Sequence, residues 1–146
     1  MNVWAILMLV FGGLFTGGAT AFLWERVPAW RRMEPSEFRN DFADAIHKAD
    51  RIQPALLVGA IVATIGFALS ATGSARTLAL IGAAGFMVTL IASGAVLVPL
   101  QRRIIASSPP QAATLEPMRR RWILGHLGRS VTGVAAFLVA SAAAAV

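Results

Sequence analysis

The chain has 146 residues, of which 57% are hydrophobic and only 14% are charged, and it contains no cysteine. Soluble domains carry roughly 25% charged residues, and small ones bury only about 60–70% of their surface, so a soluble fold is excluded. The absence of cysteine excludes disulfides, thiolate nucleophiles and cysteine-ligated metals. The net charge of +6 does not indicate nucleic-acid binding, because the basic residues flank apolar segments as membrane topology requires.

Four apolar segments are long enough to cross the hydrocarbon core, which takes roughly 17–25 helical residues. They cover about residues 3–24, 54–71, 78–100 and 122–144. Backbone polar groups find no water inside a bilayer, so each segment is expected to be helical. We therefore predict an all-α fold in which residues 1–146 form one membrane domain, a bundle of four transmembrane helices.

The first segment also resembles a secretory signal, because Ala19-Thr20-Ala21 has the pattern of a cleavage site. However, no lysine or arginine precedes it, and its apolar run is too long for the core of a signal peptide. We therefore expect the segment to remain in the protein as the first transmembrane helix.

The loop of residues 25–53 contains its own helical pattern. Phe38, Phe42 and Ile46 recur at helical spacing, and Pro35 stands at the start of the pattern, where proline is favoured. We predict an amphipathic helix there, either on the membrane surface or capping the bundle.

The second half of the chain contains three signals for turns and breaks. Gly73 and Ser74 predict a tight turn between the second and third segments, and Arg76 is the only charge in that link. Pro99 lacks a backbone N–H and is expected to kink or end the third helix. The stretch Ser107-Ser108-Pro109-Pro110 predicts an irregular, exposed loop.

Lysine and arginine counts predict the orientation in the membrane. The loop of residues 25–53 holds six of them and the loop of residues 101–121 holds five, whereas the link between the second and third segments holds only Arg76. Basic loops stay in the cytoplasm. We predict a multi-pass protein of the cell membrane, inner or plasma, with both termini on the non-cytoplasmic side.

Small residues at four-residue spacing predict where the helices pack closely, because association in lipid depends on close contact. Three helices carry such stripes. They are Gly13, Gly17 and Ala21 in the first helix, Gly85, Thr89 and Ser93 in the third, and Gly128, Thr132, Ala136 and Ala140 in the fourth.

The fourth apolar segment carries two of the three candidate catalytic residues, His126 and Arg129, and the third is Glu25 at the end of the first segment. Trp122, His126 and Arg129 follow the spacing i, i+4, i+7 and therefore share one helix face. Arg129 would lie about 12 Å inside the membrane, where a charge should face protein or a wet cavity. We expect His126 to act as a general base or ligand and Arg129 to stabilise an anion. The alternative is structural, with both side chains hydrogen-bonded to neighbouring helices and Trp122 marking the interface.

The topology brings further polar groups to the same end of the bundle. Trp24 and Glu25 end the first helix and Gln101 ends the third, so we expect Trp24, Gln101 and Trp122 to bind substrate and Glu25 to pair with Arg129. His47 and Asp50, together with Glu25 and His126, form a set of donors compatible with iron or copper. Because no spacing demands a metal, we predict no metal ligands and leave the cofactor open.

Three segments resemble the anthrone oxygenase-like family of small four-helix membrane proteins. They are Phe22-Leu23-Trp24-Glu25, Val98-Pro99-Leu100-Gln101, and Arg121-Trp122 followed by His126 and Arg129. The resemblance implies a membrane oxidoreductase, a monooxygenase that oxidises a hydrophobic phenolic or anthrone-like molecule with oxygen and no evident organic cofactor. The family usually has asparagines around the proline, where this chain has Leu97 and Gln101.

Two other classes of protein remain as alternatives. A non-enzymatic accessory or structural membrane protein predicts a closed bundle in which His126 and Arg129 are fully occupied. A small multidrug exporter needs an acid deep within a helix, and the first helix has none before Glu25. The substrate and the oligomeric state stay open at this point.

Overall fold

The computed structural model describes residues 2–108 and 111–146, and within them it contains helices and no strands. The elements are α1 (Val3–Trp30), α2 (Pro35–Asp50), α3 (Gln53–Ser70), α4 (Gly73–Ala92), the π-helical turn η1 (Ser93–Leu97), α5 (Val98–Ala106) and α6 (Ala112–Ala143). Four helical stretches in this part of the chain are long and apolar enough to cross a membrane. The predicted all-α, four-helix membrane bundle is confirmed.

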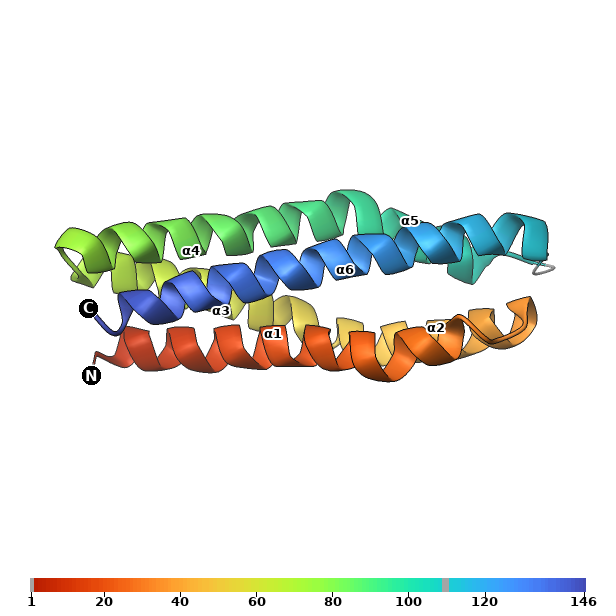
Figure 1. The fold of residues 1–146 in the computed structure, drawn as a ribbon, viewed down its shortest axis with the longest axis horizontal. Coiled ribbons are helices and arrows are strands. Elements are labelled where there is room, and N and C mark those ends of the chain that lie inside the picture. The colour runs from red at the N-terminus through yellow and green to blue at the C-terminus, as the bar shows by residue number, and fades with distance from the viewer. Residues whose placement is uncertain (1, 109–110) are drawn as a thin grey trace.

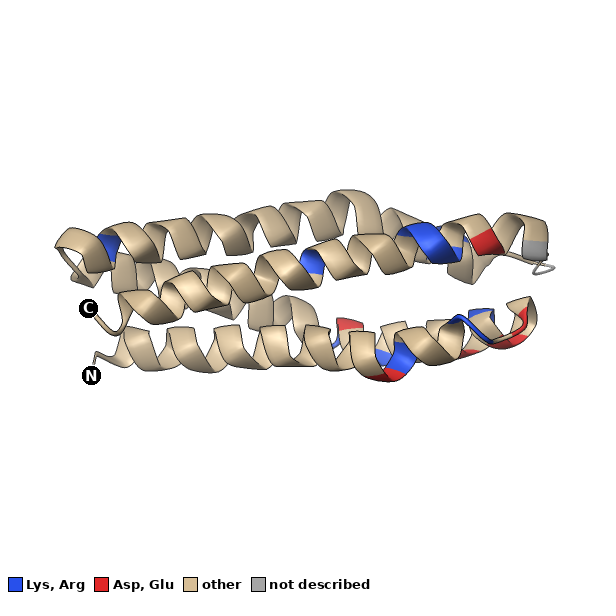
Figure 2. Ribbon diagram, viewed as in Figure 1, with Lys and Arg blue, Asp and Glu red and all other residues tan. Residues whose placement is uncertain are grey.

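The four long helices close into a ring, because α1 packs against α3 and α6, and α4 packs against the same two helices. Both termini lie at one end of this elongated bundle, and α2 and α5 lie at the other (Figure 1). Acidic and basic residues gather at the end opposite the termini (Figure 2). The bundle therefore has one apolar body and one charged end.

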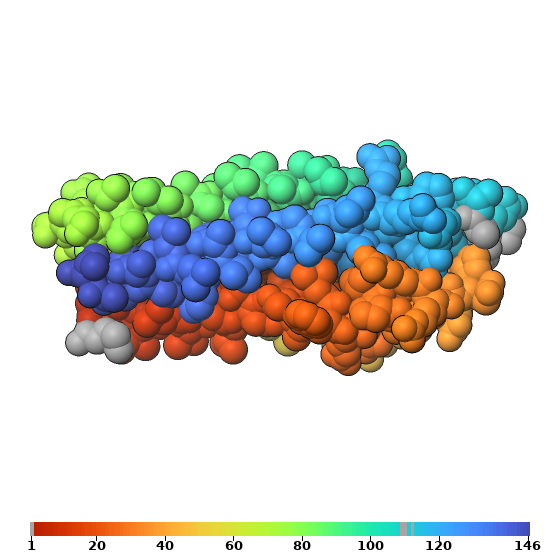
Figure 3. Space-filling model, in the orientation of Figure 1, coloured from red at the N-terminus to blue at the C-terminus, as the bar shows by residue number. Residues whose placement is uncertain are grey.

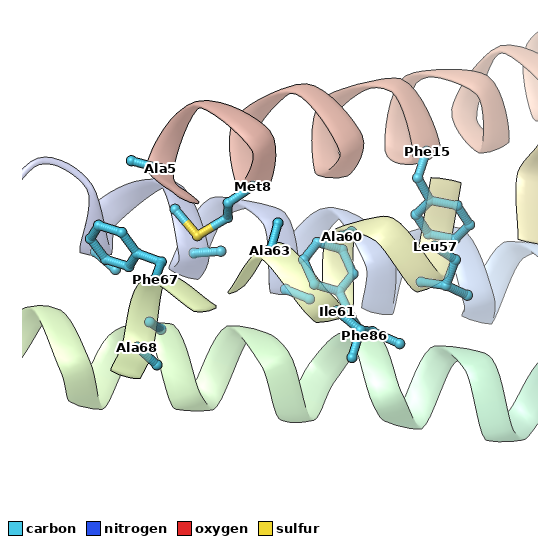
Figure 4. Close-up of a cluster of buried hydrophobic side chains, with 14 residues drawn as sticks. Ala5, Met8, Phe15, Leu57, Ala60, Ile61, Ala63, Phe67, Ala68 and Phe86 are labelled. Carbon is cyan, nitrogen blue, oxygen red and sulfur yellow. The ribbon is translucent and has the colours of Figure 1, made fainter. Parts of the chain in front are cut away.

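The apolar body is buried inside and exposed outside. Met8, Phe15 and Phe86 are completely buried at the centre, among the side chains drawn in Figure 4. Figure 3 shows the elongated outer surface of the bundle. Large apolar side chains are exposed on the outside of the helices, among them Val10, Leu14, Val62, Ile81, Ile91 and Leu138. Water would disfavour such a surface, whereas lipid matches it, so this is a multi-pass membrane protein.

The helices extend further at the charged end than the predicted membrane segments. α1 continues through Pro28 to Trp30, and α6 begins at Ala112 rather than near Trp122. Pro99 does not end the third span. The chain passes from α4 through the π-helical turn η1, and the helix then continues through Pro99 as α5. Ser107 and Ser108 are irregular as expected, and Pro109 and Pro110 lie outside the described residues.

The link at the opposite end is shorter than predicted. Only Ala71 and Thr72 separate α3 from α4, and Arg76 lies within the first turns of α4 rather than in a loop. Gly73 has a φ of 58°, a left-handed conformation that glycine adopts without a steric penalty. The glycine therefore forms the turn, as the sequence predicted, but as the first residue of the helix.

The amphipathic helix α2 caps the bundle, which decides between the two positions predicted for it. Its apolar residues Phe38, Phe42 and Ile46 are buried against the ends of α5 and α6. The buried Trp30 indole donates to the Asp41 carboxylate at 2.6 Å, which ties α2 to the end of α1. α2 thereby covers the charged end of the bundle.

The small-residue stripes predict only part of the close packing. A Cβ built on Gly85 would lie 2.8 Å from Ala136 Cβ, so this predicted contact between α4 and α6 exists. By contrast, a Cβ on Gly17 or Gly128 would meet nothing within 4 Å, so the prediction is wrong for these two. Gly82, which the stripe omitted, packs against the backbone of Ala140.

Candidate active site

A cavity of about 330 Å³ lies at the charged end of the bundle, beneath α2 and between α1, α3 and α6. Five of the six residues predicted for a site line it, namely Glu25, Gln101, Trp122, His126 and Arg129. Trp24 does not, because consecutive helical residues point about 100° apart and its side chain is 80% exposed. Trp24 has no contact with this cavity, and its role in substrate binding stays a prediction.

His126 is buried, with one ring nitrogen occupied and the other free. Its Nε2 lies 3.2 Å from the carbonyl oxygen of Ala19, and its Nδ1 has no hydrogen-bond partner among residues 2–108 and 111–146. A carbonyl only accepts, so Nε2 carries the proton and donates it, which leaves a lone pair on Nδ1 of the neutral ring. The structure thus presents an imidazole of fixed tautomer with an unused basic nitrogen.

Trp122 holds this imidazole in place. The two rings stack with centroids 4.8 Å apart and an interplanar angle of 10°, and the Phe22 ring meets His126 edge-on at 5.6 Å. Trp122 is itself packed against Trp30 and Phe42, and its indole N–H has no acceptor in the described part of the chain. The expected alternative, a tryptophan at the lipid interface, is wrong, because Trp122 is 1% exposed.

Arg129 lies on the same face of α6, as its spacing predicted, and forms no ion pair among the described residues. The expected pair with Glu25 is therefore wrong. The guanidinium carbon lies 5.2 Å from the centroid of the Phe15 ring, and Nε is buried without a partner. A cation–π contact compensates only part of the cost of placing this charge inside the bundle.

The mouth of the cavity is charged. Glu25 and Asp50 are exposed there, whereas Arg26 is paired with Asp41 at 3.3 Å and Lys48 with Asp44 at 2.7 Å. Partial desolvation raises the pKa of Asp50, which lies in α2 outside the membrane-spanning segments, and the positive charge of Arg129 opposes that rise. The positive charges of Arg129 and His47 thus partly offset the effect of desolvation on the pKa of Asp50.

Several residues of the cavity were not predicted as site residues from the sequence, and Gln53 and Gly18 are two of them. Gln53, the first residue of α3, lines it with a buried, unpartnered Oε1, and Gly18 lines it from α1. The sequence does contain a signal for Gln53, because this polar amide stands where a charged loop meets an apolar helix. The four-residue spacing selected the neighbouring Gly17 instead of Gly18, because the sequence does not show what faces each glycine.

The four side chains considered for iron or copper do not form a metal site. Glu25, Asp50 and His126 reach the cavity, but His47 instead contacts Arg51 at 2.9 Å. Within residues 2–108 and 111–146, no group of three or more histidine, aspartate or glutamate side chains is arranged to hold a metal ion.

A second, smaller cavity of about 210 Å³ lies on the other side of Arg129. It is formed where η1 widens the third span beside α6, and small or apolar residues such as Ala92, Leu97 and Gly128 line it. Arg129 lines both cavities and therefore stands between the charged end and the apolar body of the bundle.

Comparison with known proteins identifies the family. Residues 42–139, which include Gln53, Gln101, Trp122, His126 and Arg129 but not Glu25, match the family model described as anthrone oxygenase. Neither the curated proteins nor the solved structures contain a match. Because the matched range covers well over half of a four-helix membrane chain, this protein belongs to the anthrone oxygenase family.

Proposed function

We propose that this protein is a membrane-embedded oxygenase that converts a hydrophobic phenolic or anthrone-like molecule into the corresponding quinone with molecular oxygen. The observation that carries the proposal is the free Nδ1 of the buried His126, which faces no protein partner although the residue lines a cavity. An accessory protein would be expected to occupy that nitrogen, because an unsatisfied buried polar atom destabilises the fold by about 1–3 kcal/mol.

The proposed first step is removal of a proton from the substrate. The methylene group of an anthrone is acidic because its carbanion is delocalised onto the ring carbonyl as an enolate. His126 Nδ1 takes this proton, and the Ala19 carbonyl holds the ring in the tautomer that leaves Nδ1 unprotonated. The unpartnered Arg129 Nε–H and Trp122 Nε1–H donate to the enolate oxygen.

The second step uses the electrons of the substrate anion. The anion transfers one electron to O₂, and the two radicals combine to form a carbon–oxygen bond. The resulting hydroperoxide anion takes the proton back from His126 and then loses water as the carbonyl forms. The atoms balance as anthrone plus O₂ giving anthraquinone plus H₂O, with both electron pairs supplied by the substrate.

The location suits both reactants. Oxygen and aromatic hydrocarbons concentrate in lipid, and the smaller cavity beside η1 gives apolar molecules a place on the membrane side of Arg129. We further propose that the charged end with α2 faces the cytoplasm, because the loops there hold most of the lysines and arginines. The chain ends would then lie on the non-cytoplasmic side.

The test compares the two histidines of the chain. Purified protein in lipid nanodiscs is given 1,8-dihydroxyanthrone, and oxygen uptake and quinone absorbance are recorded above the rate with empty nanodiscs. We expect His126→Ala to lower kcat by about 10²–10⁴-fold, the usual contribution of a general base. His47→Ala is the matched control, because His47 is exposed on α2 and does not line the cavity.

Two results would contradict the proposal. If the wild-type protein does not exceed empty nanodiscs with any anthrone tested, the oxygenase function is wrong. If wild-type protein is active and His126→Ala is equally active, the oxygenase function stands but His126 is not the base.

A further inference from the structure

The cavity gathers most of the unsatisfied polar side-chain atoms in the described part of the protein. Six buried side-chain nitrogen or oxygen atoms there lack a hydrogen-bond partner, and four of them belong to cavity residues. These four are Gln53 Oε1, Trp122 Nε1, His126 Nδ1 and Arg129 Nε. Buried polar atoms are normally paired with protein, water or ligand, so such a concentration is typical of a binding cavity.

The four atoms differ in what they require from a ligand. Trp122 and Arg129 offer N–H groups and need an acceptor, such as the oxygen of a ketone or enolate. The proposed reaction already uses these two and His126. Gln53 Oε1 only accepts, so a ligand must bring an O–H or N–H group to it.

Gly18 creates the space that the Gln53 amide occupies. A Cβ atom at Gly18 would overlap the Nε2 atom of Gln53, whereas a Cβ at the adjacent Gly17 would meet nothing within 4 Å. Because the overlapping atom is the end of a flexible side chain, Gly18→Ala would displace the amide rather than disrupt the packing of α1 against α3. The glycine therefore acts as a positioning residue for the glutamine.

We propose that Gln53 is a substrate-binding residue that accepts a hydrogen bond from a hydroxyl group on the aromatic ring of the substrate, and that Gly18 positions it. This inference rests on the proposed function, since it concerns the same cavity. It requires a hydroxyl group on the aromatic ketone and places that hydroxyl at the start of α3, whereas the donors Trp122 and Arg129 belong to α6.

The test measures binding without turnover, using two stable quinones as probes. Quenching of tryptophan fluorescence gives the Kd of 1,3,8-trihydroxyanthraquinone and of unsubstituted anthraquinone for the protein in nanodiscs. We expect Gln53→Leu and Gly18→Ala each to weaken the trihydroxy compound about tenfold, the size of one lost hydrogen bond, and to change anthraquinone less than twofold. Gly17→Ala should leave both values unchanged.

The double variant Gly18→Ala/Gln53→Leu separates positioning from a local packing effect. If Gly18 acts only through the amide, the double variant binds the trihydroxy compound as Gln53→Leu alone does. The proposal would be overturned if the losses of affinity in the two single variants multiply in the double variant. It would also be overturned if a variant loses the same affinity for both probes. So would an unchanged Kd in Gln53→Leu.

The outcomes also distinguish this proposal from the oxygenase function. Selective loss of the hydroxylated probe in a protein without turnover would support the assignment of Gln53 and contradict the proposed reaction. If the wild type turns over 1,3,8-trihydroxyanthrone and Gln53→Leu has the same KM for it, the reaction is supported and the assignment of Gln53 is overturned.

Discussion

Arg129 provides a direct test of whether the residues in the cavity serve function rather than stability. Its guanidinium is partly buried, forms no ion pair in the described residues and contacts the Phe15 ring at 5.2 Å. We predict that Arg129→Met makes the bundle more stable and abolishes the proposed oxygenase activity. Methionine keeps an unbranched apolar side chain of similar length and removes the charge.

The size of the effect follows from two opposing contributions. Placing an arginine near the centre of a membrane helix costs about 2.5–3.5 kcal/mol, and the wet cavity lowers this cost. The cation–π contact returns about 1–2 kcal/mol. The variant should therefore gain about 0.5–2 kcal/mol in the free energy of unfolding, which raises the Tm of a chain of this size by about 1–8 °C.

The assay is thermal unfolding of both proteins in the same detergent, followed by circular dichroism at two scan rates. Arg76→Met is the control, because Arg76 is exposed at the opposite end of the bundle, and it should shift the Tm by less than half as much. A Tm that falls in Arg129→Met would refute the reasoning. It would mean that the guanidinium stabilises the helices, as the structural alternative for this residue requires.

Two further predictions concern the scaffold of the site. Gly82→Ala would place its Cβ 2.9 Å from Ala140 Cβ and 3.1 Å from the Ala140 backbone nitrogen, which cannot move aside. We therefore expect this variant to lose about 1–3 kcal/mol of stability, measured as a lower Tm. The control Gly17→Ala should leave the Tm unchanged, because its Cβ would meet nothing within 4 Å. Asp41→Ala would leave the buried Trp30 N–H without its acceptor and Arg26 without its partner. We expect a cost of about 1–3 kcal/mol and faster hydrogen exchange in α2 than in α3, whereas equal protection of α2 in this variant and the wild type would contradict that role for Asp41.

Part of the site could be predicted from residue spacing alone. Trp122, His126 and Arg129 share a face of α6 because the helix repeats every 3.6 residues, whatever lies beside it. The same rule shows why Glu25 reaches the cavity whereas Trp24 does not. Which of two neighbours points inward depends on the rotation of α1 about its axis, and that rotation is set by its contacts with α3 and α6.

The sequence by itself determined the membrane class, the four spans and the charged end. Lipid offers the backbone no hydrogen bonds, so every long apolar segment is a helix, and the charges collect outside these segments. Only the tertiary structure decided that α2 covers the cavity, that Gln53 and His126 line the same cavity, and that Arg129 forms no ion pair within the described residues. These features depend on contacts between residues far apart in the chain, whose distances and directions no local pattern encodes.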